Sequence, residues 1–247
     1  MIVLKTPFEI SQIKYSCKMV AEFLNMCNEY VKPGIVTWEL DELATKYCVD
    51  NKVIPAFKNY KGFPYAVCVS VNDEVVHGFP GSYVLKKGDI VTVDFGINRN
   101  GYFGDAAITI PIGEVTIEIK KLLKVTKECL RESIKKAVKG NKVTDISKTI
   151  ETIAHKHSFD VSHNFTGHGI GFQLHEAPKI PCYLDTNYKD MLKVGMVVAI
   201  EPILFNKKCP IQREANKWTV VSMDGSSSAH FEHTLAITEN GPEILTL

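Results

Sequence analysis

Two ten-residue stretches of the chain resemble each other, and this internal repeat constrains the fold more than any other feature. Residues 85–94 read LKKGDIVTVD and residues 192–201 read LKVGMVVAIE, with four identical positions and three conservative exchanges. The distance along the chain between these two stretches also separates the first expected helix, which starts near residue 7, from a third helix, which is expected to start near residue 114. Each half therefore has the order helix, helix, strands, with a carboxylate ending equivalent strands.

We infer two pseudo-symmetric halves, about 7–111 and 115–238, that share one sheet within a single domain of residues 1–247. No linker or low-complexity segment divides the chain. A chain of 247 residues can bury a large core, and 45% of its residues are hydrophobic.

Capping and turn signals divide each half into elements. Thr6-Pro7-Phe8-Glu9 is a capping box, and apolar residues recur at helical spacing until Pro33-Gly34. Thr37 is expected to cap a second helix. Asn100-Gly101 predicts the turn of a hairpin between strands 89–97 and 102–111. Further helices are expected at about 116–139 and 145–158, and further strands at 67–71 and 75–77 and near 196–204, 217–223 and 230–238.

Charge and cysteine content exclude several classes of protein. The chain has 29 Lys and Arg against 28 Asp and Glu, which gives no electrostatic case for a nucleic-acid binder. Its apolar stretches are well short of the roughly 18 residues of a membrane span, and its first residues do not form a signal-peptide core. Seven cysteines without a CxxC pair are typical of reduced thiols in a cytoplasmic protein.

Four acidic residues lie in or at the ends of strand-forming stretches. Asp94 lies in IVTVDF, Asp105 across the expected hairpin, Glu201 at the end of an apolar run and Glu232 in FEHTLAI. Each alone could face water at a strand end. Together they need cations, because two carboxylates ~4 Å apart repel by about 4 kcal/mol at an effective dielectric of about 20. Basic residues could supply the charge, but none holds a matching position in these strands, and divalent metal ions are the other solution.

Histidines beside glycines are the second chemical signal. His168 lies in TGHGIG, His175 follows seven residues later, and His77 precedes a glycine at an expected strand end. A phosphate-binding loop is disfavoured, because Phe172 stands where a GxGxxG motif needs its last glycine. His168 could be only a turn residue. His230 and His233 flank Glu232 and either point to the opposite face or support the site from outside.

With these residues the sequence resembles type I methionine aminopeptidases, which have the pita-bread fold, over almost its whole length. The motifs that carry the resemblance are NDEVVHG at 72–78, VDFG at 93–96, GYFGD at 101–105, TGHGIGFQLHE at 166–176, AIEP at 199–202 and FEHT at 231–234. The resemblance implies an α+β fold with two pseudo-symmetric halves around a shared curved, mainly antiparallel sheet. It also implies removal of the initiator methionine from new polypeptides, with preference for a small second residue.

The resemblance further implies a role for each site residue. Two divalent metal ions (Co, Mn, Fe or Zn) would be held by Asp94, Asp105, His168, Glu201 and Glu232, of which Asp105 and Glu232 would bridge the ions. Glu201 would shuttle a proton, His175 would hydrogen-bond the scissile carbonyl oxygen, and His77 would contact the scissile amide nitrogen. The methionine pocket would be formed by Phe57, Tyr60, Phe63, Cys68, His77, His175 and Trp218.

Five residues depart from the usual pattern of this family. Phe57 and Phe63 stand where bacterial relatives often have Cys and Tyr. Ala106, Leu174 and Cys182 replace a hydroxyl residue, an aromatic residue, and His or Asn, respectively. None is an expected metal ligand, so these departures bear on the shape of the pocket and on metal affinity.

Two other functions fit parts of the pattern. A proline-specific aminopeptidase of the same fold usually carries an N-terminal domain, whereas this chain begins with the catalytic half. A non-catalytic module that binds peptides or ribosomes would have lost metal ligands, whereas all five positions are filled. For the enzyme, we expect a cytoplasmic monomer that acts on the N-termini of nascent polypeptides and associates transiently with the ribosome. No specific nucleic acid and no membrane are expected as partners.

Overall fold

The chain alternates pairs of helices with groups of strands. The computed structural model describes residues 2–205 and 209–247. Its α-helices are α1 (Pro7–Tyr30), α2 (Trp38–Asp50), α3 (Ile117–Ile134) and α4 (Val143–Lys156), with a short 3-10 helix at Tyr60–Gly62. The first strands are β1 (Ile54–Pro55), β2 (Cys68–Val71), β3 (Glu74–Val76), β4 (Ile90–Arg99) and β5 (Tyr102–Pro111). The later strands are β6 (Asp160–Val161), β7 (Thr166–Gly169), β8 (Glu176–Pro181), β9 (Val197–Ile200), β10 (Ile203–Phe205), β11 (Ile211–Arg213), β12 (Val220–Ser222), β13 (Ser228–His230), β14 (Glu232–Thr238) and β15 (Gly241–Ile244).

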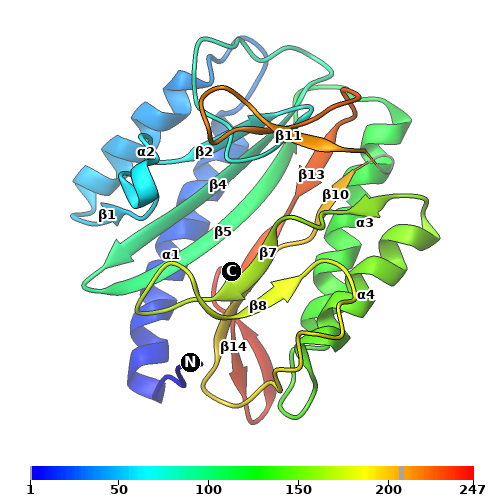
Figure 1. The fold of residues 1–247 in the computed structure, drawn as a ribbon. Coiled ribbons are helices and arrows are strands. Elements are labelled where there is room, and N and C mark those ends of the chain that lie inside the picture. Colours follow the sequence, from blue (N-terminus) through cyan, green and yellow to red (C-terminus); the bar gives the residue numbers. More distant parts are fainter. Residues whose placement is uncertain (1, 206–208) are drawn as a thin grey trace.

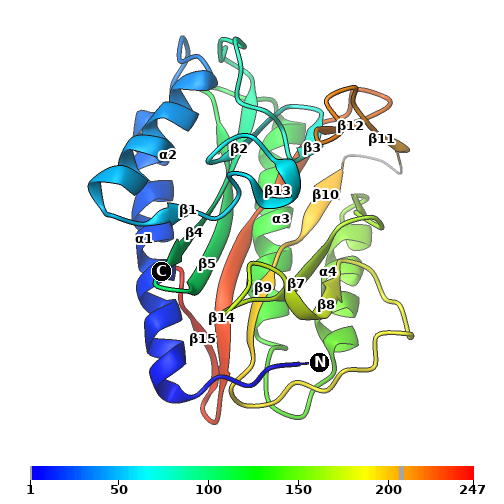
Figure 2. The ribbon, with the colours of Figure 1, turned by 60° about the vertical axis from the view of Figure 1, so that its left-hand side comes forward.

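A curved nine-stranded sheet joins the two halves (Figures 1 and 2). Its strand order is β1-β4-β5-β14-β9-β7-β8, with β2 also paired to β4 and β15 to β14. All of these pairings are antiparallel. The predicted α+β architecture is confirmed. Because β5 pairs with β14, strands from the N-terminal and C-terminal halves of the chain meet in this sheet.

Both helix pairs cover the same face of the sheet. In β4, Val93 and Phe95 lie on either side of Asp94. In β14, Leu235 and Ile237 alternate with the residues that point to the same face as Glu232. Val93 and Phe95 are buried with α1 and α2, while Leu235 and Ile237 are buried with α3 and α4. Since successive residues of a strand point to opposite faces, the acids are left on the face away from the helices. Figure 1 shows the blue pair α1 and α2 on the left and the green pair α3 and α4 on the right.

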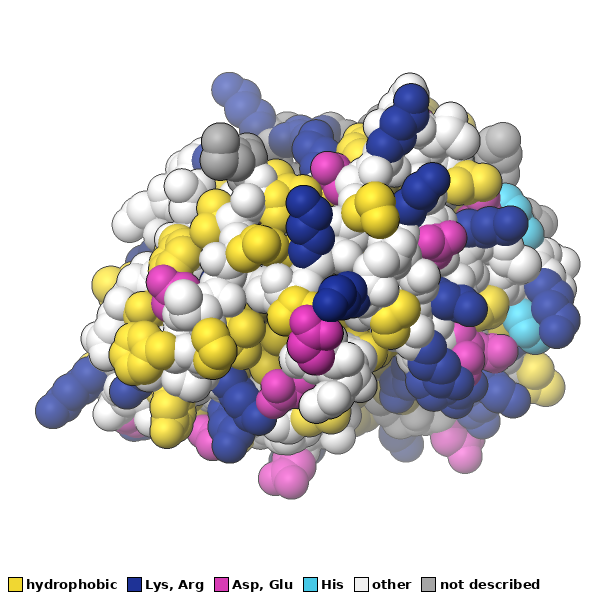
Figure 3. Space-filling view, turned by 90° about the horizontal axis from the view of Figure 1, so that it is seen from below, with side chains coloured by type: hydrophobic (Ala, Val, Ile, Leu, Met, Phe, Trp, Pro, Cys, Tyr) yellow, Lys and Arg dark blue, Asp and Glu magenta, His cyan; other side chains and the backbone are white. Residues whose placement is uncertain are grey.

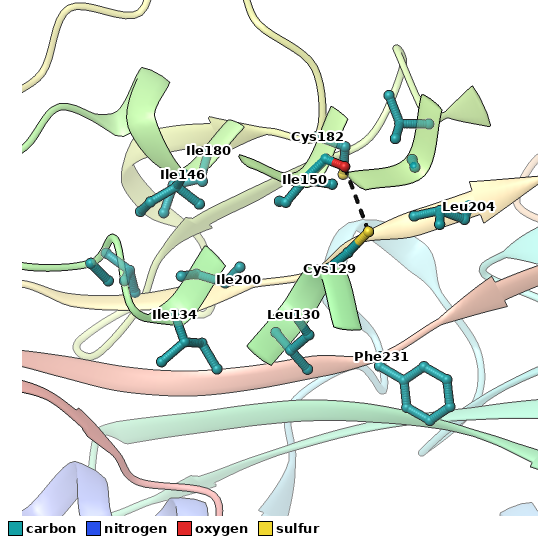
Figure 4. Packing of buried hydrophobic residues seen from close by; sticks show 14 of the residues in the cluster. Cys129, Leu130, Ile134, Ile146, Ile150, Ile180, Cys182, Ile200, Leu204 and Phe231 are labelled. Carbon is teal, nitrogen blue, oxygen red and sulfur yellow. Dashed lines mark hydrogen bonds between the residues drawn. The ribbon is translucent and has the colours of Figure 1, made fainter. Parts of the chain in front are cut away.

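The core under α3 and α4 is mostly apolar, and it also contains two thiols and the buried hydroxyl residues Thr126, Ser133 and Ser147 of the helices. Figure 4 shows Cys129 of α3 pointing towards Ile150 of α4, in a cluster that also contains Leu130 of α3 and Ile200 of β9. The thiol of Cys129 donates a weak hydrogen bond to the carbonyl oxygen of Ile150, at 3.5 Å. All seven cysteines are free thiols, as predicted.

Several local predictions are confirmed. The hydroxyl of Thr6 accepts a hydrogen bond from the backbone N–H of Glu9, and the carboxylate of Glu9 accepts one from the backbone N–H of Thr6. Asn100 and Gly101 have φ of 53° and 85°, which the tight hairpin turn between β4 and β5 requires.

Other boundaries differ from the predictions. Thr37 does not cap α2 with its side chain, because its hydroxyl is bonded to the backbone of Gly81 instead. Helix α3 ends at Ile134 rather than near 139. The backbone N–H groups of residues 136 and 137 bond to carbonyl oxygens three residues back, whereas an α-helix would use those four residues back. Helix α4 begins at Val143, because the carboxylate of Asp145 accepts from the backbone N–H of residue 142 and so lies inside the first turn. The run 196–204 is two strands, β9 and β10, separated by Glu201 and Pro202.

The surface mixes charges of both signs. In Figure 3, Lys and Arg side chains are denser on the right-hand side, with acidic and histidine side chains between them. Among the described residues, none of the helices combines the length and the apolar composition that crossing a membrane would need.

Candidate metal centre

The strand register places the four acids and His168 on one face of the sheet. Asp94 of β4 lies opposite Ala107 of β5, and Ala107 lies opposite Glu232 of β14. Directly opposed residues of a sheet share a face, so Asp94 and Glu232 point to the same side. Asp105 is two residues before Ala107 on β5 and therefore also points to that side.

The second half supplies the other two side chains through the same register. His168 of β7 lies opposite Ala199 of β9, which lies opposite Thr234 of β14. The hydroxyl of Thr234 donates to the backbone carbonyl of Asp105, at 2.8 Å, so these residues form one row across the sheet. Glu201 follows β9 two residues after Ala199 and comes level with Glu232. The five side chains thus occupy two adjacent rows.

Distances confirm that these side chains converge. Ligand-type atoms of Asp105, His168 and Glu232 all lie within 4.8 Å of one another. Nε2 of His168 is 3.7 Å from Oε1 of Glu201. Within the described part of the chain, Oδ1 of Asp94, Oδ1 of Asp105 and Oε1 of Glu232 are buried without any hydrogen-bond partner. Buried, unpartnered carboxylate oxygens beside an imidazole nitrogen are a donor set that fits a divalent cation.

Burial shifts the pKa of every ionisable group in this centre. It raises the pKa of Asp94 to about 7 and raises the pKa of Asp105, Glu201 and Glu232 well above the ordinary carboxyl value. The neighbouring carboxylates raise the pKa of the last three further. Burial lowers the pKa of His168 to about 4, which leaves its imidazole neutral and able to act as a ligand.

Glycines around His168 are required by close backbone packing. A Cβ atom at Gly167 would lie 2.4 Å from the carbonyl oxygen of Ala199, and one at Gly169 would lie 2.2 Å from that of Ala177. Both distances are far below van der Waals contact. The glycines therefore let β7 fit between β8 and β9 while His168 faces the acids. Nδ1 of His168 lies 2.9 Å from the carbonyl oxygen of Gly169, which fixes the orientation of the ring.

A cavity opens onto this centre. Its lining comprises Phe57, Tyr60, Lys61, Phe63, Cys68, His77, Asp94, Asp105, His168, Leu174, His175, Glu201, Trp218 and Glu232. The structure thus brings all twelve site residues expected from the sequence to one cavity. Their individual roles stay predictions.

Two further histidines flank the cavity in different settings. Nδ1 of His175 lies 3.0 Å from the hydroxyl of Tyr60, the two rings stack at 5.3 Å, and the His175 ring is 4.2 Å from that of His168. His77 follows β3 with φ of 57°, and its ring meets that of Trp218 edge-on at 6.0 Å. Burial lowers the pKa of His77 to about 4 and that of His175 to about 3, so both are neutral near pH 7.

Aromatic rings form the apolar part of the cavity. Phe63 meets Trp218 edge-on at a centroid distance of 5.2 Å and is 2% exposed. Phe57 and Cys68 are buried beside them in the same apolar cluster. Burial raises the pKa of the Cys68 thiol well above its usual value, so this cysteine is a neutral wall residue rather than a thiolate.

Among the residues that line the cavity, Lys61 is the one that the sequence did not single out, because no local pattern marks it. Leu174, one of the five departures from the family pattern, also lines the cavity. His230 is buried, and its Nε2 lies 3.8 Å from Glu201 and 3.7 Å from Glu232. His233 points away and contacts the hydroxyl of Thr246 instead. Of the two alternatives for this histidine pair, His230 therefore supports the site, whereas His233 lies on the opposite face.

Comparison with known proteins gives full-length matches. The family model described as metallopeptidase family M24 matches residues 11–239. The chain is 46% identical to a methionine aminopeptidase of Clostridium acetobutylicum and 45% identical to methionine aminopeptidase 1 of Bacillus subtilis. Each alignment covers 100% of this chain and 99% of the relative.

Solved structures agree. The crystal structure of methionine aminopeptidase from Thermotoga maritima superposes with a TM-score of 0.97 at 43% identity, covering 100% of this chain and 99% of that one. A prolidase from Pyrococcus furiosus has a TM-score of 0.82 at 23% identity, covering 99% of this chain and 65% of the prolidase. At that identity the second match shows a common fold only.

Proposed function

The chain belongs to metallopeptidase family M24, and from this premise we propose that it is an aminopeptidase that releases the N-terminal methionine of polypeptides. The observation that carries the proposal is that five residues with metal-ligand side chains line one cavity together with aromatic rings, and that ligand-type atoms of three of them lie within 4.8 Å of one another. Relatives named methionine aminopeptidase that align over the full chain support it. The proline-specific alternative is not favoured, because the prolidase match extends to the fold alone.

The metal would be held by the two rows of side chains on the sheet. These are Asp94, Asp105, His168, Glu201 and Glu232. Two divalent ions would balance four carboxylates, and oxygen donors with one imidazole suit Co, Mn, Fe or Zn. Bound there, the metal would polarise the scissile carbonyl and lower the pKa of a water.

His175 would stabilise the negative charge that develops on the carbonyl oxygen. If the hydroxyl of Tyr60 donates to Nδ1 of His175, the proton of the neutral ring must lie on Nε2. That N–H is then free to donate to the substrate oxygen, where charge grows during attack. Tyr60 would thus fix the tautomer of His175 as well as line the cavity.

His77 and Glu201 would handle the proton and the leaving nitrogen. His77 is neutral and lies across the cavity beside Trp218, where it would contact the amide nitrogen of the scissile bond. Glu201 would accept a proton from water as a carboxylate and, once protonated, pass it to the departing amine, and burial assists the second step because it raises the pKa of this carboxyl. A free α-amino group would meet the acids, and this limits cleavage to the first residue.

The apolar end of the cavity would bind the methionine side chain. Phe57, Phe63 and Trp218 present aromatic rings, which contact a thioether sulfur favourably. A pocket of this kind discriminates by size by only about 1–3 kcal/mol per methylene. We therefore expect methionine to be strongly preferred, with slow cleavage of other apolar first residues. We propose a small second residue as the preferred neighbour.

In the cell, the substrates would be the N-termini of nascent polypeptides. We propose that the protein acts as a monomer in the cytoplasm and meets these chains during transient association with the ribosome. Seven free cysteines support a reducing compartment.

Peptide hydrolysis tests the proposed function directly. Chelator-treated protein is resupplied with Mn, Co, Fe or Zn and given Met-Ala-Ser, a Met-Pro peptide and an X-Pro peptide with another first residue. We expect metal-dependent release of methionine from Met-Ala-Ser and little action on the last peptide. Cleavage only before proline would replace the proposal with a proline-specific activity, and no cleavage by folded protein with any metal would indicate a binding module.

A further inference from the structure

A buried ion pair joins the segment before α1 to the loop that carries His175. Nζ of Lys5 is 2.5 Å from Oε2 of Glu176, and the two side chains are 1% and 7% exposed. The other lysine and arginine ion pairs in the described part of the chain are all much more exposed. A buried pair gives little net stability, because desolvation offsets the attraction, so its presence calls for another reason.

Glu176 closes the loop between His168 and His175. Its Oε1 accepts hydrogen bonds from the backbone N–H groups of Phe172, at 2.7 Å, and Gln173, at 3.0 Å. Glu176 also pairs with Gly169, the residue after His168, at the start of β8. One carboxylate therefore binds the turn with one oxygen and Lys5 with the other.

Both the backbone and the side chain of Lys5 are held by hydrogen bonds. Its backbone N–H donates to the carbonyl oxygen of Gly195, at 2.7 Å, and its Nζ also donates to the carbonyl oxygen of Val3, at 3.2 Å. A Cβ atom at Gly171 would lie 2.6 Å from Cε of Lys5, so the stem of the lysine occupies space that only glycine leaves open. Lys5 is therefore a fixed anchor rather than a mobile surface lysine.

We propose that Lys5 is a positioning residue, which acts through Glu176 to hold the loop 170–175 and thus the imidazole of His175 at the metal centre. The inference rests on the proposed function, in which His175 contacts the substrate oxygen. His175 directly precedes Glu176 in the chain, and its ring touches those of Tyr60 and His168. Loss of the charge on Lys5 leaves a buried carboxylate uncompensated, and Glu176 must then turn away from the two backbone amides to reach water.

The test compares two lysine-to-methionine variants of the metal-loaded enzyme. Lys5→Met keeps the length of the side chain and removes its charge. Lys14→Met is the matched control, because Lys14 also pairs with a glutamate at 2.5 Å, but both partners are over 40% exposed. For Met-Ala-Ser we expect Lys5→Met to lower kcat about tenfold to a hundredfold with a smaller change in KM and with unchanged metal content. Lys14→Met should match the wild type.

Hydrogen exchange supplies a readout that does not depend on activity. In Lys5→Met the amides of Phe172 and Gln173 should exchange faster than in the wild type or in Lys14→Met. The double variant Lys5→Met/Glu176→Gln should recover most of the lost kcat and protection, since a glutamine carbonyl can accept both hydrogen bonds without a buried charge. If Lys5→Met does not fold, Lys5→Arg replaces it, and we expect a loss of a few-fold in kcat, because the wider side chain cannot fit beside Gly171.

Unchanged kcat and unchanged exchange at Phe172 and Gln173 would overturn the proposal. So would loss of metal in proportion to activity, which would make Lys5 a support of the metal centre rather than of His175. A wild type that releases no methionine would refute the proposed function instead, and the exchange of the two amides would still decide whether Lys5 holds the loop.

Discussion

Removal of metal should make the folded protein progressively less stable as the pH rises above 7. The metal-free centre contains four buried carboxyl groups whose pKa values are raised by burial, to about 7 for Asp94 and well above the ordinary value for Asp105, Glu201 and Glu232. The unfolded chain ionises the same groups near pH 4. The folded state therefore holds protons that the unfolded state has lost, and stability must fall as the pH rises.

The size of the effect follows from the number of retained protons. Each carboxyl that is protonated when folded and ionised when unfolded lowers the free energy of unfolding by about 1.4 kcal/mol per pH unit. Asp94 contributes up to about pH 7. Above pH 7 the slope is about 1.4 kcal/mol per unit for each of Asp105, Glu201 and Glu232 that keeps its proton in the folded state. Domains are stable by only about 5–15 kcal/mol, so a slope of this size removes a measurable part of the stability within two pH units.

Below pH 6.5 the histidines oppose the carboxyls. Burial lowers the pKa of His77 and His168 to about 4 and of His175 and His230 to about 3. Between pH 4 and 6.5 these rings are neutral when folded and charged when unfolded, so their contribution to stability rises with pH. Because four histidines oppose four carboxyl groups, the free energy of unfolding is expected to change little between pH 4 and 6.5. It decreases only at higher pH, where the histidines are neutral in both the folded and the unfolded state.

Urea unfolding checks this prediction, with the fluorescence of Trp38 and Trp218 as the signal. Chelator-treated and Mn-loaded protein are compared at pH 6.5, 7.5 and 8.5. The metal-free protein should lose stability across the series, and the loaded protein should not, because the metal replaces the protons. Asp105→Asn should make the metal-free slope shallower, because it removes one of the carboxyl groups whose pKa burial raises. Asp50→Asn, at an exposed ion pair with Lys46, is the control and should leave the slope unchanged. A metal-free stability that is constant or rises over this range would refute the reasoning.

Four substitutions test separate parts of the site. Asp105→Ala should lose bound metal and activity together, measured by elemental analysis and methionine release; activity restored by excess metal would contradict a bridging role. His175→Ala should lower kcat by about a hundredfold at unchanged metal content, and loss of metal would place this histidine among the ligands. Gly169→Ala should lower the melting temperature, because its Cβ would lie 2.2 Å from the carbonyl oxygen of Ala177; an unchanged melt would mean that the strands can separate freely. Cys68→Ser should change KM more than kcat, and a complete loss of turnover would reveal a catalytic thiol.

The convergence of the acids could be predicted because it depends on strand periodicity. Asp94 and Glu201 occupy equivalent places in the repeated ten-residue stretch. Asp105 lies across a hairpin whose turn is predicted by the dipeptide Asn100-Gly101. Two-residue alternation then sets their common face. The pseudo-symmetric division of the chain at about residues 111–115 stays a prediction.

What the sequence could not predict depends on side-chain contacts across distant segments. Lys5 and Glu176 are separated by most of the chain, and neither has a local pattern that pairs it with the other. The orientation of His230 is set by two hydrogen bonds between its backbone and the hydroxyl of Thr109. The cap at Thr37 was wrongly predicted for the same reason, since a backbone group of Gly81, far along the chain, competes for its hydroxyl.

The most direct test of the central claim is a titration of metal against activity in the same samples. Chelator-treated protein receives increasing Mn or Co, and bound metal and methionine release from Met-Ala-Ser are measured at each step. Release should rise with bound metal and reach its maximum at no more than two equivalents, and Glu232→Gln should lose both binding and release. Full release of methionine without metal, or full metal binding by Glu232→Gln, would contradict the assignment of this centre.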